Sequence, residues 1–250
     1  MARVTASRPL VFDSFIMNKT FVRQAHRWLG LAFSVTILMS AGSGVVHNIM
    51  TRTQSPPPAA VPAGDGLDVS QILLGVAEAA GRLPDVGQGV SAVNVRGIGG
   101  RPWYQVYLKG DRAARYVSAV DGRVDAAQDE AYAGEIASAF LGGARVRKTD
   151  FLTAFNNEYI NIFRILPVYR FDLDDDLHTR VYVSTVTGSV TRHTDDRRQF
   201  EASLFTNFHK LGFIPNKDLR DFVLTTTTLA ACIVALLGIV LFFTTRKRRA

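Results

Sequence analysis

The sequence predicts an α+β membrane protein in which two transmembrane helices flank an exported domain of two similar helix-plus-antiparallel-sheet repeats. Three observations support this fold class. Two apolar segments are long enough to cross a bilayer, a Pro- and Ala-rich linker follows the first of them, and two stretches of the intervening region resemble each other.

The apolar segments run over 28–50 and 222–243, and neither carries a charge in its interior. Each exceeds the roughly 20 residues that a helix needs to span the hydrocarbon core. A cleaved signal peptide is the alternative for the first segment, but the apolar run is too long and 27 mostly polar residues precede it. The second segment is a membrane anchor whether or not the first segment is cleaved. The single cysteine, Cys232, lies in it, so the exported domain has no disulfide.

Basic residues predict the orientation of both helices. Lys19, Arg23 and Arg27 flank the start of the first helix, and the basic run 246–249 follows the second. By the positive-inside rule both termini are cytoplasmic, and the region between the helices faces the other side. Much of the net charge of +7 comes from these flanking clusters rather than from one soluble face, which argues against nucleic acid as a partner.

The exported region contains an internal duplication. "RPWYQVYLKGDRAARYVSAVDGRV" begins at Arg101, and "LPVYRFDLDDDLHTRVYVSTVTGSV" begins at Leu166. With one inserted residue, the two stretches match at Pro102/Pro167, Tyr104/Tyr169, Leu108/Leu173, Asp111/Asp176, Arg115/Arg180, Tyr116/Tyr182, Val117/Val183 and Gly122/Gly188. Each alternates apolar and polar residues before a Gly turn, which predicts a hairpin or short meander.

A helix is expected upstream of each copy, over 68–83 with Asp68 or Ser70 as its cap, and over 130–142. A helical period is also present in "FEASLFTNFHKLGF", which predicts an amphipathic helix at the outer surface, ended by Pro215. The predicted segments are a cytoplasmic start (1–20), a transmembrane helix (21–50), a linker (51–66), two repeats (67–128 and 129–198), an interfacial helix (199–219), a second transmembrane helix (220–244) and a basic tail (245–250).

The repeats ending in "YVSAVDGRV" and "YVSTVTGSV" resemble PepSY domains, and "RQAHRWLGLAFSV" and "NFHKLGF" resemble parts of PepSY-associated transmembrane proteins. This resemblance covers about residues 20–245. It implies a protein of the bacterial cytoplasmic (inner) membrane with a periplasmic central domain. It further implies binding of haem b and outward electron transfer, from quinol or a cytoplasmic reductant to ferric iron or ferric siderophores, in iron acquisition. Other PepSY proteins are linked to peptidase inhibition, so the competing hypothesis is a cofactor-free, membrane-tethered module that regulates a peptidase or another exported partner.

His26 and His47 are the first candidate haem ligands. They are 21 residues apart, which places them on nearly the same helix face and about 31 Å apart along the axis, close to the thickness of the bilayer core. Gly30, Ser43 and Gly44 lie one turn inward and would leave room for a flat ring. The alternative is that these small residues serve helix packing and that each histidine simply lies at an interface.

His209 is the third candidate, at a height predicted to suit pairing with His47 around one haem iron. Its alternative is a surface histidine on the interfacial helix. His26 has no second histidine on its side of the membrane, so haem binding there would require His26 of a second copy, which makes a homodimer a further prediction.

Other histidines give weaker signals. Asp174, Asp175, Asp176 and His178 (within 172–178) would suit a hard cation, although such runs are more often solvated turns. His193 is expected at the solvated surface. "FNNEYINIFR" (155–164) is expected to pack the two repeats together rather than to meet a substrate. No phosphate loop, Cys pair, HExxH or G-x-S-x-G occurs, so hydrolase and nucleotide chemistry are poorly supported.

Overall fold

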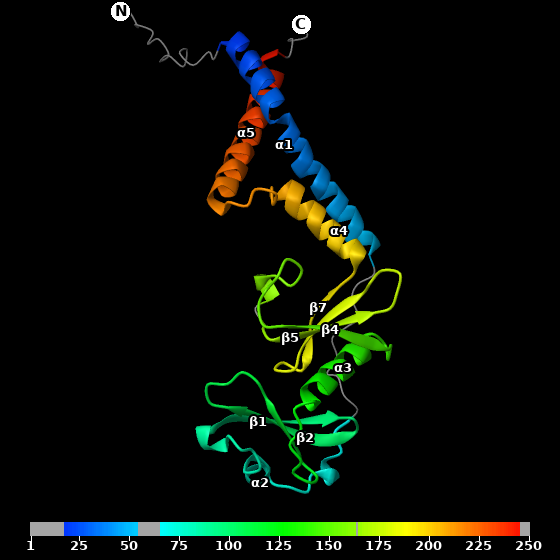
Figure 1. The fold of residues 1–250 in the computed structure, drawn as a ribbon. Coiled ribbons are helices and arrows are strands. Elements are labelled where there is room, and N and C mark those ends of the chain that lie inside the picture. Colours follow the sequence, from blue (N-terminus) through cyan, green and yellow to red (C-terminus); the bar gives the residue numbers. More distant parts are fainter. Residues whose placement is uncertain (1–17, 55–65, 164, 246–250) are drawn as a thin grey trace, which may run out of the picture. The chain divides into compact units, whose positions relative to one another are not determined.

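Figure 1 shows the computed structural model, which describes residues 18–54, 66–163 and 165–245. Most of the predicted cytoplasmic start, of the predicted linker and of the basic tail falls outside these residues, whereas 51–53 form the last turn of α1. The chain divides into two compact units, one formed by 1–54 with 201–250 and the other by 55–200.

The first unit contains two long helices, α1 (Lys19–Thr53) and α5 (Lys217–Thr245). Asn18 caps α1 by accepting a hydrogen bond from the Thr20 amide at 3.0 Å, and Asn216 caps α5 by accepting from the Leu219 amide at 2.9 Å. Both helices are long and apolar enough to cross a membrane, which weakly supports membrane association and agrees with the two predicted spans. The two helices pack together, and Figure 1 shows that they meet at the ends that lie near the chain termini.

The helix before α5 differs from its prediction. The structure contains α4 (Asp196–Leu204), which continues directly into a π-helix, η4 (Phe205–His209), that packs along α1 (Figure 1). The predicted helix 199–219 therefore starts too late and ends too late. The helix stops because Leu211 adopts a φ of 50° and the Gly212 amide turns back to donate to the Thr206 carbonyl at 2.9 Å.

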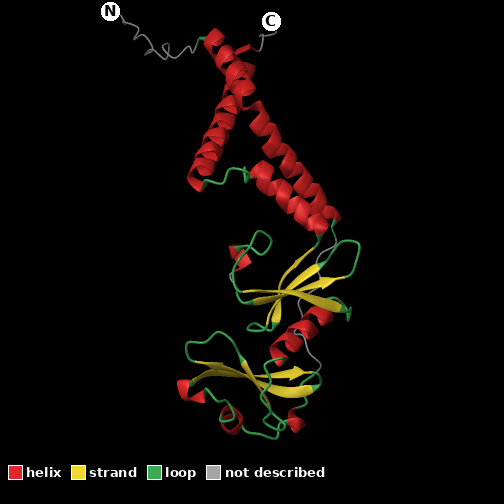
Figure 2. Ribbon diagram, in the orientation of Figure 1, coloured by secondary structure: helices red, strands yellow, loops and turns green. Residues whose placement is uncertain are grey.

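The second unit contains two antiparallel sheets and several short helices (Figure 2). The first sheet has the order β1 (Val90–Ile98), β2 (Arg101–Leu108), β3 (Arg115–Ser118), and the second has the order β4 (Val146–Leu152), β5 (Val168–Leu173), β6 (Arg180–Ser184), β7 (Ser189–Thr194). The helices are η1 (Val69–Gln71), α2 (Val76–Ala80), η2 (Val86–Gln88), α3 (Gln128–Phe140) and η3 (Asn161–Phe163).

The residues that match between the two sequence copies occupy equivalent places in the two sheets. Tyr104 pairs with Val117 across β2 and β3, and their counterparts Tyr169 and Val183 pair across β5 and β6. The bridge from Val117 to Val124 likewise corresponds to the pairing of Val183 with Val190. The two halves of the domain are thus built on one strand register.

The helices of the two copies are unequal. The predicted helix 130–142 is present as α3, but the predicted helix 68–83 is broken into η1 and α2, with Asp68 capping η1. The break occurs because the amides of Leu73 and Leu74 donate to the Ala119 carbonyl at 2.9 and 3.0 Å, and the Tyr104 hydroxyl donates to the Leu74 carbonyl at 2.7 Å. These tertiary hydrogen bonds replace the helical ones.

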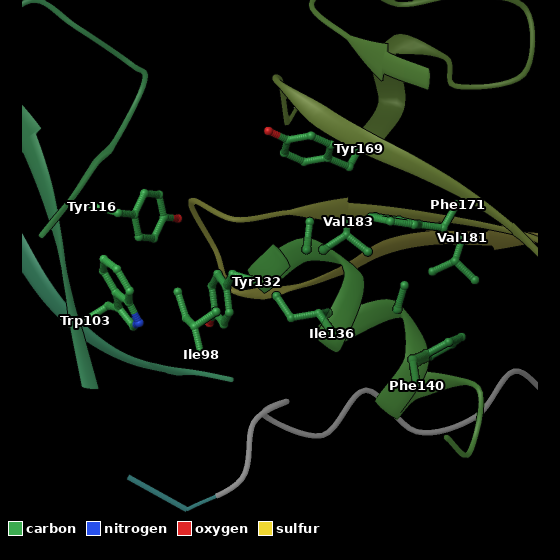
Figure 3. Close-up of a cluster of buried hydrophobic side chains, with 12 residues drawn as sticks. Ile98, Trp103, Tyr116, Tyr132, Ile136, Phe140, Tyr169, Phe171, Val181 and Val183 are labelled. Carbon is green, nitrogen blue, oxygen red and sulfur yellow. The ribbon is translucent and has the colours of Figure 1, made fainter. Parts of the chain in front are cut away.

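The main core is shared by both sheets, which corrects the picture of two separate α+β units. Figure 3 shows α3 lying between side chains from the first sheet, such as Trp103, and side chains from the second, such as Phe171. The buried cluster contains Ile98, Trp103, Tyr116, Tyr132, Ala133, Ile136, Ala137, Phe140, Tyr169, Phe171, Val181 and Val183. A smaller cluster beneath the other face of the first sheet includes Ala79, Leu83, Val106 and Val117.

A polar junction accompanies this core. Asp129, in the first turn of α3, accepts hydrogen bonds from the hydroxyls of Tyr116 at 2.7 Å and Tyr169 at 2.9 Å, one from each sheet. Gln105, fully buried, donates to the Tyr116 hydroxyl at 2.8 Å and to the Thr185 carbonyl at 2.9 Å. Burial and the Asp129 charge both raise the pKa values of Tyr116 and Tyr169, so both hydroxyls remain protonated donors.

The segment 155–164 was expected to pack the two repeats together, but its buried residue Tyr159 packs on the second sheet instead. Tyr159 is fully buried against Val168 and Tyr182 of the second sheet, with its ring stacked on Tyr182 at 4.9 Å. Its hydroxyl donates to the Ile165 carbonyl at 3.0 Å. Glu158 accepts from the Tyr182 hydroxyl at 2.5 Å. These residues therefore cover their own sheet rather than join the two copies.

Candidate functional site

His26 lies where α1 packs on α5. Its Nδ1 is 3.0 Å from the Val234 carbonyl oxygen, and a Cβ at Gly238 would stand only 3.3 Å from its Cε1. A Cβ at Gly30 would lie 3.8 Å from the Val234 side chain. Gly238, which the sequence analysis did not single out, thus makes room for the imidazole, whereas Gly30 faces the neighbouring helix as the packing interpretation predicts.

His47 lies near the other end of α1 and is bound to an acid. Its Nδ1 is 2.6 Å from Glu201 Oε1, and the Glu201 carboxylate also accepts from Thr51 at 3.3 Å and Gln54 at 2.8 Å. The Glu201 side chain is only 13% exposed. The Glu201 carboxylate can lie this shielded from water because three hydrogen-bond donors, in α1 and at its C-cap, surround its oxygens.

His209 is the last residue of the π-helix. Its Nδ1 lies 3.1 Å from the Ser40 carbonyl oxygen and 3.3 Å from the Ser40 hydroxyl. The wider turn of a π-helix is often found at functional positions, because the inserted residue changes the direction of the side chains that follow. Here it accompanies a contact between His209 and the backbone of α1.

Phe205 contacts two of the three imidazoles. Its ring is stacked on His209 with a centroid distance of 4.5 Å and an interplanar angle of 12°, and it packs against His47 at 4.9 Å and 39°. His209 contacts Ser40, which precedes His47 by two helical turns of α1. The Phe205 ring thus packs against both imidazoles, and the pairing of His47 with His209 around one iron stays a prediction.

The donor chemistry of the three histidines is nevertheless uniform. A carbonyl oxygen can only accept, so the Nδ1 atoms of His26 and His209 carry the proton, and the carboxylate imposes the same on His47. A neutral imidazole then keeps its lone pair on Nε2, which is the arrangement of a metal-ligating histidine whose other nitrogen is held by an oxygen. Each of the three imidazoles therefore fits haem iron as a single ligand through its Nε2.

The other sequence-predicted groups lie in the second unit. His178 Nδ1 is 2.7 Å from Asp196, and Asp175 caps the turn by accepting from the Thr179 amide at 2.7 Å. Among the described residues no group of three or more His, Cys, Asp or Glu side chains is placed to share a metal ion. The acidic run forms the turn between β5 and β6, held by these hydrogen bonds.

His193 corrects a prediction. It is partly buried, its ring packs against Phe140 at 5.5 Å, and its Nδ1 is shielded from solvent with no hydrogen-bond partner among the described residues. Burial lowers the pKa of His193 and the nearby Arg198 lowers it further, while Asp195 and Asp175 oppose this shift. Expecting a solvated histidine was wrong because β7 turns its side chain toward α3.

Two residues of this site that the sequence analysis missed, Glu201 and Phe205, follow a recoverable pattern together with His209. Glu201, Phe205 and His209 recur every four residues and so lie on one helix face. The opposing face of α1 carries a stripe of polar residues at helical spacing, comprising Ser40, Ser43, His47, Thr51 and Gln54. A polar stripe on an otherwise apolar membrane helix predicts a partner helix, and matching the two periodicities would have identified Glu201 and Phe205.

No family model, no curated protein and no solved structure matches this chain.

Proposed function

We propose that the protein binds haem b within a membrane and transfers electrons to ferric iron or a ferric siderophore in iron acquisition. The observation that carries this proposal is that the Nδ1 atom of each of three imidazoles lies 2.6–3.1 Å from an oxygen, so that Nε2 is the nitrogen left to ligate a metal. Haem iron supplies one-electron chemistry when bound, with a potential set by its ligands and their hydrogen bonds.

The role of the chain is to position and tune the ligands. The carbonyls of Val234 and Ser40 fix the rings of His26 and His209. The Glu201 carboxylate places negative charge beside His47 and so makes its Nε2 a stronger donor. His26 has no second histidine on its side of the membrane, so a haem held there would need His26 of a second copy, which makes the protein a homodimer.

The membrane is the bacterial cytoplasmic membrane, with both chain termini in the cytoplasm and the two-sheet domain in the periplasm. Lys19, Arg23 and Arg27, at the start of α1, support this orientation. Quinol or a cytoplasmic reductant is the electron donor. The ferric acceptor is reduced at the periplasmic side.

The test is the absorption spectrum of the full chain purified in detergent from haem-replete cells. We expect a Soret band and a bound-haem ratio that falls in His26→Ala, His47→Ala and His209→Ala. His178→Ala is the matched control, since this histidine is also held by an acid but lies in the other unit. Glu201→Gln should retain haem and raise its reduction potential, because the negative charge next to His47 is lost.

A second candidate function is a cofactor-free, membrane-tethered module that regulates a peptidase or another exported partner. The packing of Phe205 against both His47 and His209 favours it, because a ring fills space there without any ligand. A colourless preparation that takes up no added haemin, together with normal iron use in a deletion strain, would exclude the haem proposal and support this one. Full haem retention in all three alanine variants would exclude the assigned ligands.

A further inference from the structure

A pocket of about 640 Å³ lies at one corner of the second sheet. Its walls come from the start of β4 and the end of β5, together with the turn that contains His178. Arg147 of β4 is paired directly opposite Asp172 of β5. Arg145 and Asp174 extend these two strands outward along the same corner and also line the pocket.

The charges in this pocket are unequally satisfied. Asp172 accepts two hydrogen bonds from the Arg170 guanidinium, at 2.8 and 3.1 Å, and one from Thr149 at 2.9 Å. His178 is held by Asp196. Within the described residues, neither Arg145 nor Arg147 forms an ion pair or a side-chain hydrogen bond.

Two unpaired guanidiniums therefore face one hollow, with a single unpaired carboxylate, Asp174, at its edge. Arg145 directly precedes β4 and Arg147 lies near its start, and both line the pocket, so the two guanidiniums suit two oxyanion groups on one small molecule. Guanidinium binds carboxylate through two parallel hydrogen bonds, whereas Asp174 accepts a hydrogen bond from a hydroxyl.

We propose that this pocket binds a small hydroxylated di- or tricarboxylate anion, with Arg145 and Arg147 each taking one carboxylate group. The imidazole of His178 lines the same pocket and offers its remaining nitrogen to the ligand. The site lies in the second unit and uses none of the histidines assigned to haem, so it stands independently of the proposed function.

Citrate is the probe, titrated by calorimetry into the full-length protein in detergent and a zwitterionic buffer. We expect saturable binding with one citrate per chain. Arg145→Gln and Arg147→Gln should each weaken the affinity at least about tenfold, since each removes one charge-assisted pair of hydrogen bonds. Arg101→Gln should leave it unchanged, because this exposed strand arginine lies in the first sheet, away from the pocket.

Three results would overturn the proposal. The first is the absence of saturable citrate binding by a folded protein, and the second is an equal loss of affinity in Arg101→Gln, which would indicate binding to net charge. The third is tighter binding of inorganic phosphate than of citrate, which would exclude a polycarboxylate. Circular dichroism of each variant verifies that the domain is folded, and Arg145→Lys, which keeps the charge but loses the paired geometry, should bind more weakly than the wild type.

Discussion

Replacing Asp129 by alanine should destabilise the two-sheet domain more than any other change of a partly exposed carboxylate in it. Asp129 accepts one hydrogen bond from Tyr116 of the first sheet and one from Tyr169 of the second. A hydrogen bond to a charged group contributes about 1.5–3 kcal/mol. Since Asp129 is partly exposed and water can replace part of what is lost, we expect Asp129→Ala to lower the free energy of unfolding by about 3 kcal/mol.

Trp103 provides the assay, because it is 3% exposed and belongs to the core that α3 shares with both sheets. The only other tryptophan, Trp28, lies in α1, so a Trp28→Phe background makes fluorescence report on the domain alone. Urea unfolding of the full chain in detergent then gives the change in stability. Asp176→Ala, at an exposed carboxylate of the hairpin turn, is the control and should change stability by less than about 0.5 kcal/mol.

A double-mutant cycle isolates the hydrogen bond itself. Tyr116→Phe should cost about 1.5 kcal/mol in the normal background and distinctly less when Asp129 is already alanine. Strict additivity of the two changes, or a cost of Asp129→Ala no larger than that of the control, would refute the conclusion that this carboxylate joins the sheets.

Two further predictions concern the same domain. Because burial lowers the pKa of His193 in the folded state, the unfolded chain takes up a proton at this histidine at a higher pH than the folded chain does. The contribution of His193 to stability should therefore be complete above pH 6.5 and be lost as the pH falls from there through the folded-state pKa. His193→Leu should abolish this part of the pH dependence of unfolding, measured by Trp103 fluorescence, and an unchanged pH profile in the variant would contradict the prediction. Gly188 has a φ of 65°, and a Cβ there would stand 2.6 Å from the Tyr132 hydroxyl, so Gly188→Ala should lower stability by about 2–4 kcal/mol. Gly110→Ala, with a φ of 80° and open space, should cost only the backbone strain of about 1–2 kcal/mol, and equal losses would show that the clash is absent.

The strand register of the domain could be predicted from the duplicated sequence, whereas its core could not. The matched Tyr and Val residues pair equivalently in both sheets because alternation along a strand is a local property. That α3 serves both sheets depends on side chains far apart in the chain, such as Ile98 and Val181. The break in the helix predicted over 68–83 has the same origin, because the Ala119 carbonyl that competes for its amides lies far along the chain.

The candidate site divides in the same way. The three histidines and the small residues near them are visible in the sequence, as is the four-residue spacing of Glu201, Phe205 and His209. The partners of the histidines are not, since Val234 and Ser40 contribute backbone carbonyls that carry no side-chain signal. The expected depth of His209 was counted back from α5, and the turn at Leu211 interrupts the helix along which that count runs.

By itself the sequence determined where apolar length, charge asymmetry and strand alternation lie along the chain, because these features depend on residues close together in it. Only the tertiary structure decided which nitrogen of each imidazole is engaged, which ring separates His47 from His209, and which helix lies between the two sheets. Those outcomes depend on contacts between distant segments, and such contacts form only when the whole fold places hydrogen-bond donors, acceptors and apolar faces together.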